Sequence, residues 1–210
     1  MACIVAITIS LVVIIAGCTT STNTTTSPTS NVSSTASTTV GSMTADSMTI
    51  LGNMAMYQNA TVGVQFTYPQ NWTVASDPTS NGSDPACYCI IWPNNGDIRL
   101  PYPSYVSFHK FSNTDNETLL NVVNSNLQSY IDYGATVVQN VTSTTLGGVP
   151  AFKFVVTFNA NNNPKTPIER LFICTLKGDS FYTIRYSAST PYYASTLNDV
   201  QQIINSFAFI

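Results

Sequence analysis

Charged side chains are scarce in this sequence. Only 8% of its 210 residues are Asp, Glu, Lys or Arg, and the formal net charge at pH 7 is −3. The seven Lys and Arg residues are scattered singly and form no basic stripe of the kind that contacts phosphates. The composition therefore excludes a nucleic-acid partner, and solubility has to come from Asn, Ser and Thr.

Histidine is also rare, with His109 as the single example, and no Gly-x-Ser-x-Gly sequence occurs. Hydrolytic chemistry needs a nucleophile beside a base, so the sequence gives little support for a hydrolase. Three carboxylates gather at Asp77, Asp84 and Asp97, but two of them precede proline and are typical of turns. The sequence predicts a protein that is not an enzyme, with no catalytic residue and no cofactor.

An uncharged, mainly aliphatic run occupies residues 2–17. It is as long as a signal-peptide core but shorter than the roughly 20 residues of a spanning helix. The run ends in Ile15-Ala16-Gly17-Cys18, which resembles the lipobox of exported lipoproteins and implies that Cys18 carries a lipid. An export signal normally begins with a positive charge, but no Lys or Arg precedes this run, so either the true start lies upstream or the segment stays uncleaved as a short anchor. Residues 1–18 are thus predicted to be a signal peptide with a lipobox or a membrane anchor.

The residues that follow, 19–56, form a Ser/Thr-rich spacer. Between Thr19 and Thr49 there is no aromatic residue and one charge, Asp46, so the segment cannot bury enough apolar surface to fold. We predict a disordered, extended stalk on the extracytoplasmic face of a cell membrane. Asn-x-Ser/Thr sequons suit a glycosylated exterior, and they begin at Asn23, Asn31, Asn59, Asn71, Asn81, Asn116 and Asn140.

Residues 57–210 are predicted to form one α+β domain. Apolar side chains alternate with small or polar ones from Val62 to Tyr68, which indicates a strand with one buried face. Glycine-containing turns at Gly147-Gly148 and Gly178-Asp179 suit antiparallel hairpins. Further strands are predicted over residues 105–111, 136–144, 151–159, 169–176 and 181–188.

Two amphipathic helices are predicted in the same domain. The first follows a capping box at residues 114–117 and ends at Gly134. Its predicted apolar face consists of Leu120, Val123, Leu127 and Ile131. The second begins at Thr190 and Pro191. Its apolar stripe consists of Tyr193, Leu197, Val200, Ile204 and Phe207.

Several motifs occur in an order that resembles the PsbP fold family. They are Phe66-Thr67-Tyr68-Pro69 followed by Trp72-Thr73-Val74, then residues 148–154, and finally Tyr182-x-Ile184-x-Tyr186 before the last helix. The resemblance covers roughly residues 58–210. It implies an antiparallel β-sheet sandwiched between helices, in a family whose members are mostly binding or assembly proteins rather than enzymes.

Cysteine is sparse in the predicted domain, with Cys87, Cys89 and Cys174 its only examples. In an oxidising exterior the default expectation is a disulfide. Two cysteines two apart in a strand have Cα atoms about 7 Å apart, which is too far for an easy bond. We therefore predict that Cys87 or Cys89 pairs with Cys174.

A soft-metal site is the alternative interpretation of the same residues. The thiols of Cys87 and Cys89 could hold Cu(I) or Zn(II), and His109 could add an imidazole nitrogen. Thioethers that also suit Cu(I) cluster between the spacer and the domain, at Met43, Met48, Met54 and Met56. The alternative function is therefore a copper or zinc carrier of the cell envelope.

The segment from Ser76 to Pro103 is predicted to be a long loop that is rich in proline and aromatic residues. Long structured loops often carry function, and aromatic side chains make good anchors for a protein or a sugar. The candidate anchors are Tyr88, Trp92, Tyr102 and Tyr105. The favoured function is thus a membrane-anchored accessory protein that binds an envelope protein or glycan.

Overall fold

The computed structural model describes residues 50–51, 53–76, 86–94, 104–159 and 167–210, all of them within the compact unit Ala45–Ile210. The predictions for residues 1–49, including the anchor at Cys18 and most of the spacer, lie outside the described residues.

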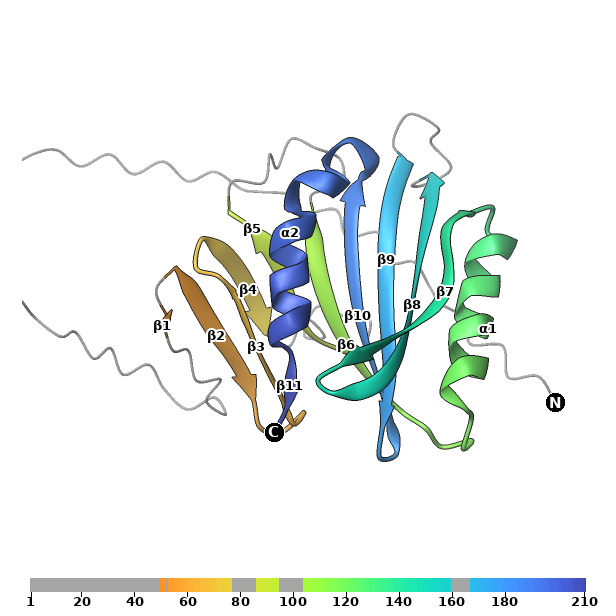
Figure 1. Ribbon diagram of the computed structural model, residues 1–210, viewed down its shortest axis with the longest axis horizontal. Helices are drawn as coiled ribbons and strands as arrows, with labels where there is room; N and C mark the ends of the chain where they lie inside the picture. The colour runs from red at the N-terminus through yellow and green to blue at the C-terminus, as the bar shows by residue number, and fades with distance from the viewer. Residues whose placement is uncertain (1–49, 52, 77–85, 95–103, 160–166) are drawn as a thin grey trace, which may run out of the picture. The chain divides into compact units, whose positions relative to one another are not determined.

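A seven-stranded antiparallel sheet forms the centre of this unit (Figure 1). Its strand order is β4-β5-β6-β10-β9-β8-β7, so β4 and β7 are the edges. Both predicted glycine turns are confirmed, because Gly147 and Gly178 have positive φ angles and join paired strands. The strands are β4 (Trp72–Ser76), β5 (Cys87–Pro93), β6 (Tyr105–Ser112), β7 (Thr136–Leu146), β8 (Val149–Asn159), β9 (Pro167–Lys177) and β10 (Ser180–Ser189).

A smaller four-stranded sheet, in the order β1-β2-β3-β11, packs against part of the first. Its members are β1 (Ile50–Leu51), β2 (Met54–Asn59), β3 (Val64–Pro69) and β11 (Ala208–Phe209). Alternation along β3 is as predicted: Val64, Phe66 and Tyr68 are buried and the residues between them are half-buried. The ring of Phe66 stacks on that of Phe108 at 4.2 Å and so joins the two sheets.

This smaller sheet was not anticipated, and it moves the boundary of the folded domain. β1 and the start of β2 lie within residues 19–56, which the sequence assigns to the spacer. Within β2 the side chains of Ala55 and Tyr57 are buried, and the strand pairs with β3 along its whole length. The folded part therefore begins before residue 57.

Helix α1 (Leu119–Asp132) packs against β7, β8 and β9. Its N-cap is Thr118, whose hydroxyl accepts a 3.3 Å hydrogen bond from the Asn121 amide, rather than the predicted capping box. The predicted apolar face is also displaced, because Leu120 and Ile131 are 44% and 40% exposed. The side chains that pack on the sheet are Leu119, Val123, Leu127 and Tyr130.

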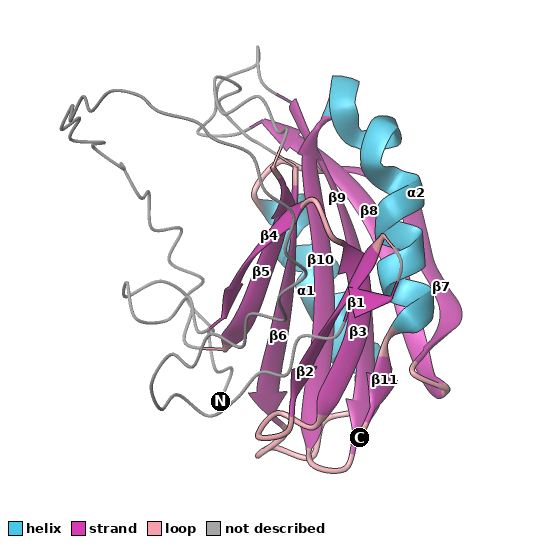
Figure 2. Ribbon diagram, turned by 90° about the vertical axis from the view of Figure 1, so that its left-hand side faces the viewer, coloured by secondary structure: helices cyan, strands magenta, loops and turns pink. Residues whose placement is uncertain are grey.

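Helix α2 (Thr190–Ser206) packs against β3, β9 and β10, and its predicted apolar stripe is confirmed. Along β8 and β9, successive side chains belong alternately to the apolar cluster under α1 and to the cluster under α2. Phe154 and Phe172 belong to the apolar cluster of α1, whereas Val155 and Leu171 belong to the cluster of α2. Figure 2 shows the two helices, in cyan, beside the strands of this sheet. The described part is thus mostly antiparallel sheet with two helices, as the predicted α+β class requires.

Candidate functional site

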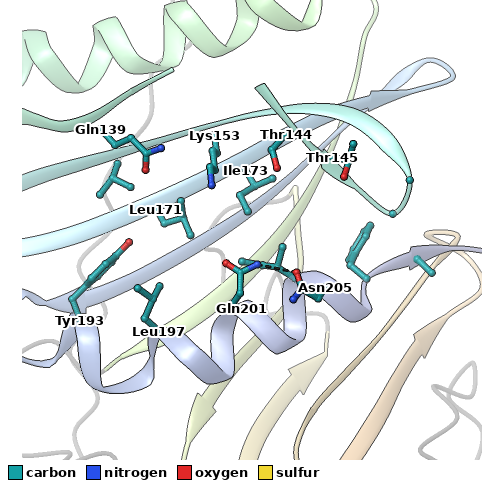
Figure 3. A pocket seen from close by; sticks show the side chains of 16 residues that line it. Gln139, Thr144, Thr145, Lys153, Leu171, Ile173, Tyr193, Leu197, Gln201 and Asn205 are labelled. Carbon is teal, nitrogen blue, oxygen red and sulfur yellow. Dashed lines mark hydrogen bonds between the residues drawn. The ribbon is translucent and has the colours of Figure 1, made fainter. Parts of the chain in front are cut away.

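A groove of about 520 Å³ lies between α2 and the sheet strands β7, β8 and β9 (Figure 3). Its floor is apolar, with Val155 from β8 and Leu171 and Ile173 from β9. One wall comes from α2 and carries Leu197, while β7 contributes polar side chains to the opposite wall. The volume falls in the range of roughly 300–1,000 Å³ that is usual for small-ligand sites.

The β7–β8 hairpin closes one end of the groove. Gly147 and Gly148 form its turn with φ angles of 56° and 76°, a conformation that other residues adopt at a cost. Gly147 also packs so closely that an added Cβ would lie 2.9 Å from the Phe209 ring. The curl of this hairpin toward β11 is visible in Figure 1. Glycine is thus required where the hairpin tip meets the smaller sheet.

Lys153 is the one charged side chain among the groove-lining residues that the structure describes. It lies on β8 between Ala151 and Val155, both of which are buried in the cluster that α2 covers. Its side chain is half-buried beside Ile173 in the floor (Figure 3). A lysine therefore occupies a strand position where alternation calls for an apolar residue.

Tyr193 lies at the opposite end of the groove from the glycine turn (Figure 3). Burial, together with the nearby Glu169 carboxylate, raises the pKa of the Tyr193 hydroxyl above its ordinary value. Burial likewise raises the pKa of Glu169. The Tyr193 hydroxyl is consequently protonated at neutral pH.

Side-chain amides form the polar rim of the groove. Gln201 donates a 2.9 Å hydrogen bond to the Oδ1 atom of Asn205 on the next turn of α2, and Gln139 donates to Thr142 on β7. None of the described residues that line this groove is a His, Cys, Asp or Glu. The groove thus offers hydrogen bonds, one cation and apolar surface, a combination that is usual in sites that bind small ligands.

The predicted disulfide is wrong for this fold. Cys174 lies on β9 and is a buried free thiol. Strands β6 and β10 separate it from Cys87 and Cys89 on β5, and three strand spacings amount to about 14 Å. A disulfide needs Cα atoms within about 7 Å, so neither cysteine of β5 can reach Cys174.

The described residues give the metal alternative no set of ligands. Cys87 is the direct cross-strand partner of His109, but no third His, Cys, Asp or Glu side chain of the described part joins a metal-sized group with them. Met54 and Met56 lie on β2, whereas Met43 and Met48 are outside the described residues.

The segment predicted as one loop contains strand β5, so its aromatic residues have different roles from those expected. The strand was missed because every residue from Cys87 to Pro93 is apolar or aromatic, so the sequence shows no polar–apolar alternation, although burial alternates along the folded strand. Tyr88 packs on the core beside Phe108, and burial is the main reason that the pKa of its hydroxyl is raised. Trp92 pairs with Thr73 of β4. Tyr102 lies outside the described residues.

Tyr105 belongs to a polar network around Arg170, on the side of β9 that faces α1. The Arg170 guanidinium donates hydrogen bonds to Ser187 Oγ at 2.7 Å, Tyr130 Oη at 2.6 Å and Tyr105 Oη at 3.4 Å. It also lies 5.0 Å from the centre of the Phe158 ring. Tyr105 therefore helps to join α1 and the sheet, a role that the sequence pattern did not indicate.

The described sequons differ in how available their Asn side chains are. Asn71, Asn116 and Asn140 are exposed, while Asn59 is half-buried. The Asn59 amide donates to the Tyr57 hydroxyl, and its oxygen accepts from the Val62 amide, so it is engaged in the β2–β3 turn. Asn23, Asn31 and Asn81 lie outside the described residues.

The layered antiparallel sheet with two helices defines the class of protein as PsbP-like. The sequence pattern of the family described as PsbP-like protein matches residues 1–209, and the chain belongs to this family. A search of curated proteins found no match. Among the described residues, neither helix is both long and apolar enough to cross a membrane.

Solved structures with the same fold support this assignment. CyanoP, the cyanobacterial PsbP of Synechocystis sp. PCC 6803, is 15% identical with a TM-score of 0.55, over 76% of this chain and 94% of its own. LpqN of Mycobacterium tuberculosis, described as involved in cell envelope biogenesis, is 11% identical with a TM-score of 0.51, over 69% of this chain and 82% of its own. At these identities the similarity concerns the fold alone.

Proposed function

We propose that this protein is a non-enzymatic accessory protein that binds a ligand in the groove between α2 and strands β7, β8 and β9. The observation that carries the proposal is Lys153, a half-buried cation in an apolar floor. A polar residue at a core position usually weakens a fold, so its presence at such a position indicates a function. Ligand binding is the function that this combination of residues suits best.

We further propose that the protein acts on the extracytoplasmic face of a cell membrane. Cys18 would carry the lipid, and the Ser/Thr-rich residues would hold the domain away from the bilayer. The described involvement of LpqN in cell envelope biogenesis agrees with this location.

We also propose that the large sheet lies between two layers, with α1 on one face and α2 together with the smaller sheet on the other.

Site-specific photo-crosslinking in living cells tests the groove directly. A benzophenone amino acid replaces Gln201, an exposed residue of the groove rim, in the full chain. We expect an adduct that depends on ultraviolet light, and its mass distinguishes a protein partner from a glycan or a small molecule. The control position is Asn124, which is exposed on α1 far from the groove lining.

A second variant shows whether the adduct depends on the groove. Leu197→Trp adds a ring to the groove wall and should abolish the adduct at position 201. The matched control is Asn198→Trp, which places the same ring on the exposed side of α2 and should leave the adduct unchanged. Equal adducts at positions 201 and 124, or no effect of Leu197→Trp, would overturn the proposal.

A further inference from the structure

The position of Lys153 restricts the chemistry of the ligand. Along β8 the side chains of Phe152, Phe154 and Val156 belong to the cluster covered by α1, so Lys153 faces α2 with Ala151 and Val155. Its direct cross-strand neighbours are Ile173 on β9 and Thr142 on β7. The ammonium group therefore projects over apolar surface from the middle of the sheet face.

The ammonium group of Lys153 makes no hydrogen bond or ion pair with any residue that the structure describes. Within the described part of the chain no carboxylate lines the groove, and the facing polar wall consists of uncharged Gln and Thr side chains. The Lys153 stem is half-buried, while its ammonium group still reaches water from the groove. A cation beside apolar surface attracts an anion more strongly than one in open water, so an anion entering the groove would find its partner in Lys153.

The rest of the groove restricts the remainder of the ligand. Val155, Leu171 and Ile173 form a continuous apolar floor, and Leu197 extends it onto the wall. Tyr193 bounds this floor at one end, while Phe207 and the Gly147 turn bound it at the other. Such a surface favours an aliphatic body, because burying apolar area contributes roughly 25 cal/mol per Å².

We propose that the groove binds an amphipathic anion, with its carboxylate or phosphate group at Lys153 and its aliphatic body on the floor formed by Val155, Leu171 and Ile173. The proposal rests on the proposed function and names the ligand class of the same groove. The anion would accept charge-assisted hydrogen bonds from the Lys153 ammonium group, which are stronger than hydrogen bonds between neutral groups. The ligand could come from a membrane lipid or from a free acid, since both have this chemistry.

Equilibrium dialysis of the full chain with four probes tests the proposal. The probes are dodecanoate, dodecyl phosphate, dodecyltrimethylammonium and acetate, all below the concentrations at which they form micelles. We expect both dodecyl anions to bind at least tenfold more tightly than the cation and than acetate. Because the apolar residues 2–17 are the same in every sample, their own affinity for a dodecyl chain cancels in the comparison between variants.

Two lysine substitutions make the comparison specific. Lys153→Met keeps the length of the side chain, removes the charge and should weaken binding of both anions at least tenfold. Lys177→Met is the control, because Lys177 is exposed on β9 and lies outside the groove. It should leave the dissociation constants within twofold. A thermal melt of each variant verifies that it is folded.

Vesicles distinguish the two sources of the ligand. Extraction of phosphatidylglycerol from vesicles, dependent on Lys153 and absent with phosphatidylcholine, would support the proposal with a lipid source. Binding of the soluble anions alone, again dependent on Lys153, would support it with a free acid. Equal binding of the dodecyl cation, or no effect of Lys153→Met, would overturn it. If the groove-dependent crosslink at position 201 persisted in that case, only the ligand class would be wrong.

Discussion

Arg170 shows how a single residue joins distant parts of this fold. Its guanidinium connects β9 with β10 through Ser187, with α1 through Tyr130 and with β6 through Tyr105. Tyrosine hydroxyls and aromatic faces, instead of a carboxylate, surround the charge among the described residues. This arrangement suits a chain with few acidic residues, because neutral groups then satisfy a buried donor.

The Tyr130→Phe substitution measures this network. It removes the acceptor of a 2.6 Å hydrogen bond and leaves one guanidinium N–H without that partner, so we expect a loss of about 1–3 kcal/mol in the free energy of unfolding. Tyr133→Phe is the control, because Tyr133 is 72% exposed, and it should change stability by less than about 0.5 kcal/mol. Urea unfolding gives both values. Equal stability of the two variants would show that the network contributes nothing.

Lys153 was visible in the sequence as a lysine between aromatic residues, in Phe152-Lys153-Phe154. The pattern alone favours a solvent-exposed face for the lysine, with the two phenylalanines buried on the other. Only the position of α2 reveals that the lysine's face is also apolar and partly covered. The groove could not be predicted for this reason, since it depends on how a distant helix packs.

At the scale of elements, strands with many apolar residues between clear turns were predicted well. β3, β6, β8, β9 and β10 each contain or overlap the expected segment, and the buried residues of β6, β8, β9 and β10 lie on both faces of the sheet. Strand β5 was missed because its sequence is apolar or aromatic at every position and so shows no alternation, and β11 because two residues are too short to show a pattern. In α1, Leu119 takes the place that the sequence suggested for Leu120.

The turn between β7 and β8 allows a prediction about the Gly147→Ala substitution. Alanine at a φ of 56° costs about 1–2 kcal/mol, and its Cβ would lie 2.9 Å from the Phe209 ring. Phe207 and Tyr182 hold that ring at 5.2 and 5.0 Å. We therefore expect a total loss of about 2–4 kcal/mol, measured by urea unfolding.

Gly178→Ala is the matched control for this turn. Its φ is 58°, but no atom lies within 4 Å of the added Cβ, so only the backbone cost of about 1–2 kcal/mol should remain. The difference between the two variants then reports the contact with Phe209. If both lost the same amount, the hairpin tip would not be packed against the smaller sheet in solution.

At the scale of the whole molecule, the proposed location makes a prediction about Cys18. Cys18→Ser should abolish incorporation of a labelled fatty acid and release the chain from the membrane fraction, because the acyl group attaches through the thiol. Cys3→Ser is the control, since Cys3 lies inside the same apolar run but outside the lipobox. Retention of Cys18→Ser in the membrane would instead indicate an uncleaved anchor.

The edge of β3 has a consequence for the order in which the chain folds. The Thr67 amide donates to Ser206 Oγ at 2.8 Å, and Ser206 donates back to the Thr67 carbonyl at 3.2 Å, across 139 positions of sequence. The hydroxyl thus replaces a neighbouring strand at this point. Contacts between residues so far apart form late, because the entropy of closing the loop opposes them. Until α2 and β11 dock, β3 presents an open edge that other chains can pair with, and the docking of this C-terminal segment closes the edge.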